Sequence, residues 1–203
     1  MEINWLLNFG NNMYFVLLSY TILGAGLKYL DDAFDEKTFN KNVALTIAPL
    51  LGILGAYTIL INPVSATILL AVLIGVLLKG KIDSYAHLLS FLTFFVLFVL
   101  LGIFKVMILP LIFIAAAAVL DEVGNDAIDY NMRYKKKRRF RYQFVVYFFG
   151  RRYLTKAALL YLVLLNIIPL YFLLALILFD EAYIIVGLYS QTRKEKAKLP
   201  KAS

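Results

Sequence analysis

The chain has 203 residues, of which 62% are hydrophobic and 17% are charged, and its mean hydropathy is +0.79. Soluble domains contain about 45–50% apolar residues, so the composition excludes a disordered chain and an ordinary soluble domain. The absence of cysteine excludes disulfide bonds and a thiol nucleophile, and the single histidine, His87, excludes a histidine-rich metal site. The net charge is +8, and in a chain this apolar we expect the positive charge to lie at a membrane surface and not to bind nucleic acid.

Apolar segments of about 20 residues, the length that crosses a bilayer as an α-helix, follow one another in chain order. We predict seven of them, at about residues 9–30, 43–61, 64–80, 86–103, 105–121, 153–168 and 170–189. Asn62-Pro63 separates the second from the third, and turns are expected at residues 102–105 and 166–169. The sequence therefore predicts an all-α, polytopic transmembrane bundle of about seven helices, forming a single domain over residues 1–192.

The distribution of lysine and arginine predicts the orientation, because short cytoplasmic loops carry the excess of both residues. With the N-terminus outside, 20 of the 21 basic residues fall on the inner side and only Lys105 falls on the outer side. Ten lie between Arg133 and Lys156, in and just after a cytoplasmic loop at about residues 121–152, and five lie in a basic, disordered tail at residues 193–203. This pattern predicts a multi-pass protein of the cell membrane whose basic loop contacts anionic lipid headgroups.

Most of the 13 acidic residues lie at the inner ends of the predicted helices, where neighbouring helix ends can converge. Carboxylates three or four residues apart share one face of a helix, and they repel one another unless a cation neutralises them. Hard oxygen ligands of this kind suit Mg²⁺. The candidate metal ligands are Asp31, Asp32 and Asp35 in one cluster and Glu122, Asp126 and Asp129 in the other. The alternative is that these acids are solvated at helix ends or pair with the basic loop.

Asp83 and His87 form a second constellation, four residues apart at the start of the fourth predicted helix. A carboxylate beside an imidazole orients the ring and raises its basicity, as general acid–base catalysis requires. These two residues are therefore the candidate catalytic pair. The alternative is that Asp83 or Ser84 caps the N-terminus of the helix and that His87 lies at the membrane interface.

The basic run at residues 135–141 has two interpretations. The first is a topogenic signal and an anchor to anionic lipid, worth about 1 kcal/mol for each charge near the surface. The second is a clamp for a phosphate-bearing substrate beside the metal, in which Lys135, Arg138 and Arg139 are the binding residues.

The two acidic segments also resemble those of the UbiA-type intramembrane prenyltransferases. Asp31-Asp32-Ala33-Phe34-Asp35 resembles the start of the first motif of that family, Asn-Asp-x-x-Asp, with Asp31 in place of the asparagine. Glu122-Val123-Gly124-Asn125-Asp126 resembles the second motif, Asp-x-x-x-Asp, with glutamate first. The last aspartate of the first motif falls on Phe39, and the family is longer and has nine helices. The resemblance implies Mg²⁺ and a prenyl diphosphate bound at cytoplasmic helix ends.

Three functions follow as hypotheses from these observations. The first is a membrane enzyme that acts on a lipid or prenyl phosphate through Mg²⁺, with an apolar helical body around the lipid chain. The second is an ion or solute transporter or channel, for which Asp180, Glu181 and Asn166 are the ionisable or polar residues near the membrane midplane. The third is a non-catalytic membrane scaffold subunit.

Overall fold

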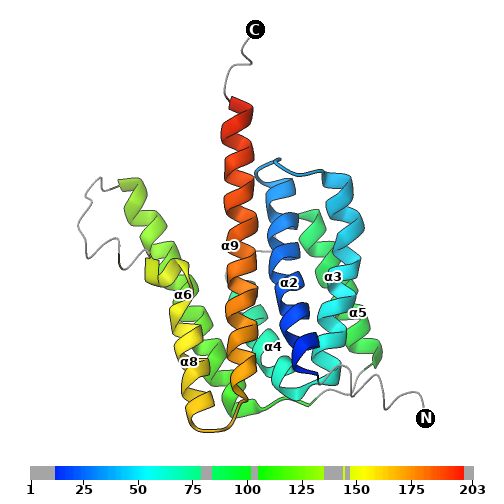
Figure 1. Ribbon diagram of the computed structural model, residues 1–203, viewed down its shortest axis with the longest axis vertical. Helices are drawn as coiled ribbons and strands as arrows, with labels where there is room; N and C mark the ends of the chain where they lie inside the picture. Colours follow the sequence, from blue (N-terminus) through cyan, green and yellow to red (C-terminus); the bar gives the residue numbers. More distant parts are fainter. Residues whose placement is uncertain (1–11, 79–83, 102–104, 135–143, 145–146, 199–203) are drawn as a thin grey trace. The chain divides into compact units, whose positions relative to one another are not determined.

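A computed structural model describes residues 12–78, 84–101, 105–134, 144 and 147–198, without the side chains of residues 126–134 and 197–198. These residues are helical apart from short turns, and none of them lies in a strand. The helices are α2 (Met13–Phe34), α3 (Lys41–Ile61), α4 (Pro63–Leu78), α5 (Tyr85–Leu101), α6 (Ile108–Tyr134), α8 (Tyr153–Leu164) and α9 (Leu170–Lys198) (Figure 1). Residue 144 and residues 147–150, before α8, are helical as well. The predicted all-α helical bundle is thus confirmed.

Each predicted apolar segment coincides with one of these helices, but their lengths differ. Four helices, α2, α3, α6 and α9, contain a stretch that is long and apolar enough to cross a membrane. The other three are shorter, with 16 residues in α4, 17 in α5 and 12 in α8. At 1.5 Å of rise per residue, α8 is only about 18 Å long, against about 30 Å of hydrocarbon in a bilayer. Seven complete spans and their orientation therefore remain a prediction.

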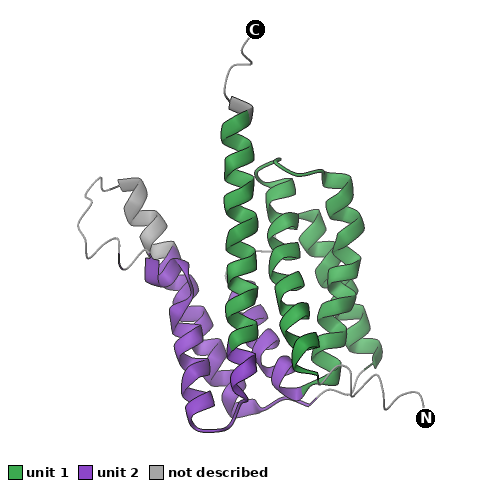
Figure 2. Ribbon diagram, viewed as in Figure 1, with its two compact units in different colours: residues 1–62, 82–104, 174–203 green, residues 63–81, 105–173 purple. Residues whose placement is uncertain are grey.

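The chain divides into two compact units (Figure 2). Unit 1 comprises residues 1–62, 82–104 and 174–203, and unit 2 comprises residues 63–81 and 105–173. We describe each unit by itself.

In unit 1, α2 packs against α3, α5 and α9. Gly24 allows α9 to approach closely, because a Cβ at this position would overlap the carbonyl oxygen of Phe179. Farther along α2, the stem of Lys28 lies over Gly187, where an added Cβ would be 3.0 Å from Lys28 Cε. Residue numbers rise together along this contact, so α2 and α9 are parallel. Small residues that permit such backbone approach are typical of helix packing in membranes.

In unit 2, α4 packs on α6 and α6 packs on α8. Phe113 of α6 and Tyr161 of α8 have ring centroids 5.8 Å apart. The turn predicted after α8 is present: Asn166 has φ of 56°, and the N–H of Ile167 donates to the carbonyl of Leu162 at 3.0 Å. Asparagine tolerates this left-handed conformation better than most residues do, so its presence here is consistent with the turn predicted from the sequence.

Two predicted boundaries differ from the structure. The basic loop was expected to begin at residue 121, whereas α6 continues to Tyr134, and the tail was expected to be disordered from residue 193, whereas α9 continues to Lys198. Hydropathy marks the end of an apolar run and not the end of a helix. Neither extension contains proline, and polar residues with good helix propensity continue a helix into water.

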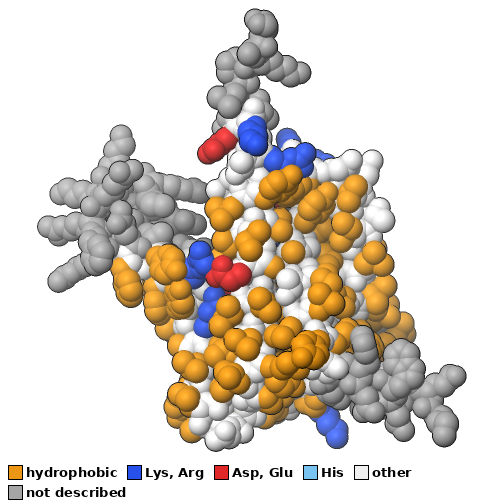
Figure 3. Space-filling view, viewed as in Figure 1, with side chains coloured by type: hydrophobic (Ala, Val, Ile, Leu, Met, Phe, Trp, Pro, Cys, Tyr) orange, Lys and Arg blue, Asp and Glu red, His pale blue; other side chains and the backbone are white. Residues whose placement is uncertain are grey.

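The outer surface of the helices is strongly apolar (Figure 3). Large hydrophobic side chains are exposed on every helix that the structure describes with its side chains. On α5 only Ala86 and Ser90 are buried, and Val99 and Leu100 are 59% and 74% exposed. Soluble monomers rarely expose apolar patches beyond a few hundred Å². Together with the four long apolar helices, this surface indicates a membrane protein.

Candidate functional site

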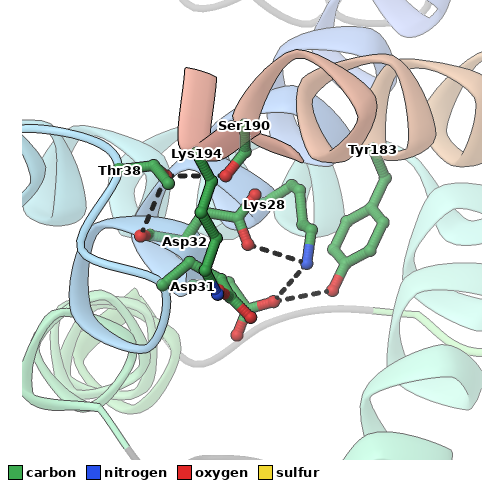
Figure 4. A network of polar contacts seen from close by, with 8 residues as sticks. Lys28, Asp31, Asp32, Thr38, Tyr183, Ser190 and Lys194 are labelled. Carbon is green, nitrogen blue, oxygen red and sulfur yellow. Dashed lines mark hydrogen bonds and ion pairs between the residues drawn. The ribbon is translucent and has the colours of Figure 1, made fainter. Parts of the chain in front are cut away.

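A charged centre lies at the end of α2 in unit 1 (Figure 4). Lys28 Nζ lies 2.8 Å from Asp31 Oδ2 and 3.0 Å from Asp32 Oδ1. The spacings of three and four residues place all three side chains on one face of the helix. The hydroxyl of Tyr183, from α9, donates to Asp31 Oδ2 at 3.2 Å, and Lys28 Nζ is 5.1 Å from the centroid of the Tyr183 ring. We call these four residues the Lys28 centre.

Asp32 is the buried member of the Lys28 centre. Its side chain is only 4% exposed. Its Oδ1 atom faces Lys28, whereas Oδ2 is buried and accepts no hydrogen bond from any residue that the structure describes. One ammonium also serves two carboxylates, so Lys28, Asp31 and Asp32 together keep a net charge of −1. A buried, uncompensated carboxylate oxygen is costly, and a further cation or proton would relieve that cost.

The turn after α2 connects the Lys28 centre to α9. The backbone N–H and the hydroxyl of Thr38 both donate to the carbonyl of Asp32, at 3.2 and 3.3 Å. The same hydroxyl lies 2.6 Å from that of Ser190. Lys37 has φ of 54°, a left-handed conformation that reverses the chain here. Asp35, the third predicted ligand of this cluster, lies at the C-cap of α2 with an exposed side chain.

The second acidic segment has a structural role in unit 2 at the residues whose side chains are described. Asp121 Oδ1 accepts the N–H of Leu154 at 3.1 Å, and Oδ2 accepts the N–H and the hydroxyl of Thr155, each at 2.7 Å. These are the first donors of α8, whose own N-cap residue, Arg152, provides no side-chain acceptor. Glu122 Oε1 lies 3.0 Å from Arg152 Nη2, with its side chain 5% exposed. Asp121 and Glu122 of α6 thus hold the N-terminus of α8 through hydrogen bonds and an ion pair.

The remaining predicted site residues are only partly described. The Ser84 hydroxyl lies 2.9 Å from His87 Nδ1 and accepts the N–H of His87 at 3.2 Å, so Ser84 caps α5. The other six candidates, or their side chains, lie outside the described residues: Asp83, Asp126, Asp129, Lys135, Arg138 and Arg139, of which Asp126 and Asp129 have a described helical backbone.

Magnesium binding is therefore neither confirmed nor contradicted. Among the side chains that the structure describes, no group of three or more histidine or acidic residues is arranged to hold a metal ion. Asp31 and Asp32 belong to unit 1 and Glu122 belongs to unit 2, so convergence of the two predicted clusters stays a prediction.

Lys28, Tyr183 and Asp121 are the polar residues that sequence reasoning did not assign to a site. Lys28 carried a local signal, because a lysine three and four residues before two aspartates pairs with them on a helix. Tyr183 carried none, because 152 residues separate it from Asp31. The signal for Asp121 was indirect: α8 begins without a capping side chain of its own.

Comparisons with protein-family models, with curated proteins and with solved structures gave no match. The fold defines the class: over the described residues the protein is helical, and four of the described helices are long and apolar enough to cross a membrane.

Proposed function

We propose that the chain is a multi-pass integral membrane protein that binds a lipid or prenyl phosphate through a divalent cation at the Lys28 centre, with the ends of α2 and α9 in the cytoplasm. The apolar outer surface and the four long helices support the membrane part. The parallel course of α2 and α9 agrees with an odd number of spans between the first and the last one. The excess of lysine and arginine on one side supports the orientation.

The observation that supports cation binding is the buried Oδ2 atom of Asp32, to which no described residue donates a hydrogen bond. Further oxygen groups belong to the same centre, namely the carboxylate of Asp31 and the hydroxyl of Tyr183. Mg²⁺ usually takes one or two carboxylates and completes its shell with water and phosphate oxygens. In this proposal Asp31 and Asp32 hold the cation, which neutralises a phosphate. Lys28 supplies a second positive charge beside that phosphate.

The test is the thermal stability of the detergent-purified chain with millimolar Mg²⁺, Mn²⁺ or Ca²⁺, each with and without farnesyl diphosphate. A ligand that binds the folded state stabilises it by mass action. We expect a cation-dependent rise in Tm that grows with the diphosphate and is lost in Asp32→Asn. Glu195→Gln, an exposed acid of α9 outside the centre, is the matched control. No rise with any cation, or an equal rise in Asp32→Asn and Asp31→Asn, would overturn the proposal.

Cation-coupled transport is the second candidate, and Asp180 is the observation that favours it. This residue lies within the apolar stretch of α9 and is only 6% exposed. Ionisable residues inside spanning helices commonly mark ion or proton pathways. In liposomes that contain the purified chain, a proton or Na⁺ flux that Asp180→Asn abolishes would select transport. Asn166, a residue considered for the same role, lies in the turn between α8 and α9.

A further inference from the structure

Three aromatic rings stack at the end of unit 1 where α2 and α9 finish. The rings of Tyr29 and Phe39 are nearly parallel with centroids 4.4 Å apart, and those of Phe39 and Tyr189 follow at 6.2 Å. They come from α2, from the turn before α3 and from α9. We call these three rings the aromatic shelf.

Arg193 lies over the aromatic shelf. Its guanidinium carbon is 5.7 Å from the centroid of Phe39 and 5.8 Å from that of Tyr189. A cation–π contact of this kind holds the guanidinium over the rings without using its N–H groups, which can bind a phosphate in a bidentate manner. The residue is exposed, and none of the described carboxylates is within ion-pair distance of it. Its neighbour Lys194, by contrast, is paired with Glu36.

Further positive charge surrounds the aromatic shelf. Lys41 lies with Nζ 5.3 Å from the ring centroid of Phe34, and Lys37, in the turn before α3, is exposed. Figure 3 shows basic side chains gathered at this end of unit 1. Aromatic rings and basic tips at the ends of spanning helices are typical of the headgroup level of a bilayer.

We propose that Arg193 and the aromatic shelf form a binding site for the phosphate of an anionic phospholipid in the cytoplasmic leaflet. The guanidinium edge binds the phosphate, and the rings contact the glycerol and the first methylenes of the acyl chains. Charge and position together favour this occupant, because Arg193, which no described carboxylate pairs with, lies towards the end of two long apolar helices. The inference rests on the membrane part of the proposed function and is independent of the cation at the Lys28 centre.

The test measures Tm of the full chain in mixed micelles as the mole fraction of phosphatidylglycerol rises, with phosphatidylcholine and soluble glycerol phosphate as separate arms. We expect stabilisation by phosphatidylglycerol alone. In Arg193→Ala the half-saturating mole fraction should rise about fivefold to tenfold, because one charge near the surface contributes about 1 kcal/mol or more. Phe39→Leu should weaken binding as well, although it removes no charge.

Lys196→Ala is the matched control, since Lys196 is an exposed basic residue three positions farther along the same helix. It should change the half-saturating mole fraction less than twofold. An equal loss in Arg193→Ala and Lys196→Ala would show diffuse attraction and overturn the site, as would equal stabilisation by glycerol phosphate. If Arg193→Ala does not fold, Arg193→Lys replaces it, and undiminished binding would count against the site. A chain that stays monodisperse in water without detergent would instead overturn the membrane placement itself.

Discussion

Asp121 and Thr155 make a double contact between α6 and α8: one carboxylate oxygen accepts both the N–H and the hydroxyl of the threonine, each at 2.7 Å. An acidic residue on one helix thereby supplies the N-terminal cap of another. It also adds a negative charge at the positive end of the α8 dipole. Short helices have little stability of their own, so the position of α8 depends on this contact.

Replacing Asp121 should loosen α8. Asp121→Ala leaves three donors of α8 without their acceptor, and hydrogen bonds to a charged group contribute about 1.5–3 kcal/mol each. Because water can solvate part of the freed donors, the three contributions do not add in full, and we expect a loss of about 2–4 kcal/mol in the free energy of unfolding, measured by denaturant titration in detergent. Asp121→Asn keeps one carbonyl acceptor and should cost less. A loss below that of Glu195→Gln, an exposed acid, would contradict the capping role.

Gly24 should tolerate no side chain. A Cβ there would overlap the backbone of Phe179, which cannot rotate away as a side chain can. Gly24→Ala should therefore separate α2 from α9 and destabilise the fold by about 1–3 kcal/mol. Gly55→Ala is the matched control, because its Cβ would meet only Phe94 and Leu23 at 3.7 and 3.8 Å.

The control should be neutral or stabilising by up to about 1 kcal/mol, since alanine favours a helix more than glycine does. Thermal unfolding of both variants in the same detergent decides the comparison. Equal stabilities of Gly24→Ala and Gly55→Ala would contradict the close contact between α2 and α9.

The pair formed by Glu36 and Lys194 gives a prediction on pH. The ammonium of Lys194 holds the pKa of the Glu36 carboxyl below its ordinary value of 4.5. A lowered pKa in the folded state means that the pair stabilises the fold above pH 4.5 and that this contribution is lost as the pH falls through the folded-state pKa. Because both side chains are exposed, the contribution should be below about 1 kcal/mol.

Glu36→Gln should therefore lower Tm slightly at pH 7 relative to the parent chain, and this difference should shrink as the pH falls through the folded-state pKa of Glu36. Stability curves at several pH values check this. A difference that grows as the pH falls would contradict the pairing.

Replacing Lys37 with glycine should stabilise the folded chain. Its φ of 54° costs a residue with a Cβ about 1 kcal/mol, whereas glycine adopts this conformation without strain. Lys37→Gly should stabilise the folded chain by up to about 1 kcal/mol after the greater freedom of glycine in the unfolded chain is offset. Lys41→Gly, which places glycine inside the first turn of α3, is the opposite control and should destabilise. The two changes in Tm should differ in sign.

Local signals explain what could be predicted from the sequence. Asn62 ends α3 directly before Pro63, which opens α4, and Ser84 precedes α5 as a serine cap does. The apolar runs locate each of the seven helices from α2 to α6, α8 and α9, but not the helical residues 147–150. The ends of α6 and α9 were misplaced because a polar helix in water has no hydropathy signal.

The site was predicted only in part for a different reason. Asp31 and Asp32 were recognised as a cluster by their spacing, and the structure places them together. Their ion pairs with Lys28 follow from the same helical spacing, and they compensate one of the two negative charges. The contribution of Tyr183 depends on the packing of α2 against α9, which no local pattern encodes.

The order in which these contacts arise during synthesis follows from the Lys28 centre. Its two ion pairs join residues within a single turn of α2, whereas Tyr183 is made 152 residues after Asp31. The ion pairs can therefore form as α2 leaves the ribosome, and in the proposed membrane placement they reduce the charge that α2 carries into the bilayer. The close contact between Gly24 and Phe179 of α9 can form only after most of the polypeptide has been translated. Insertion of α2 and its final docking are thus separate events, and only the second requires the later helix.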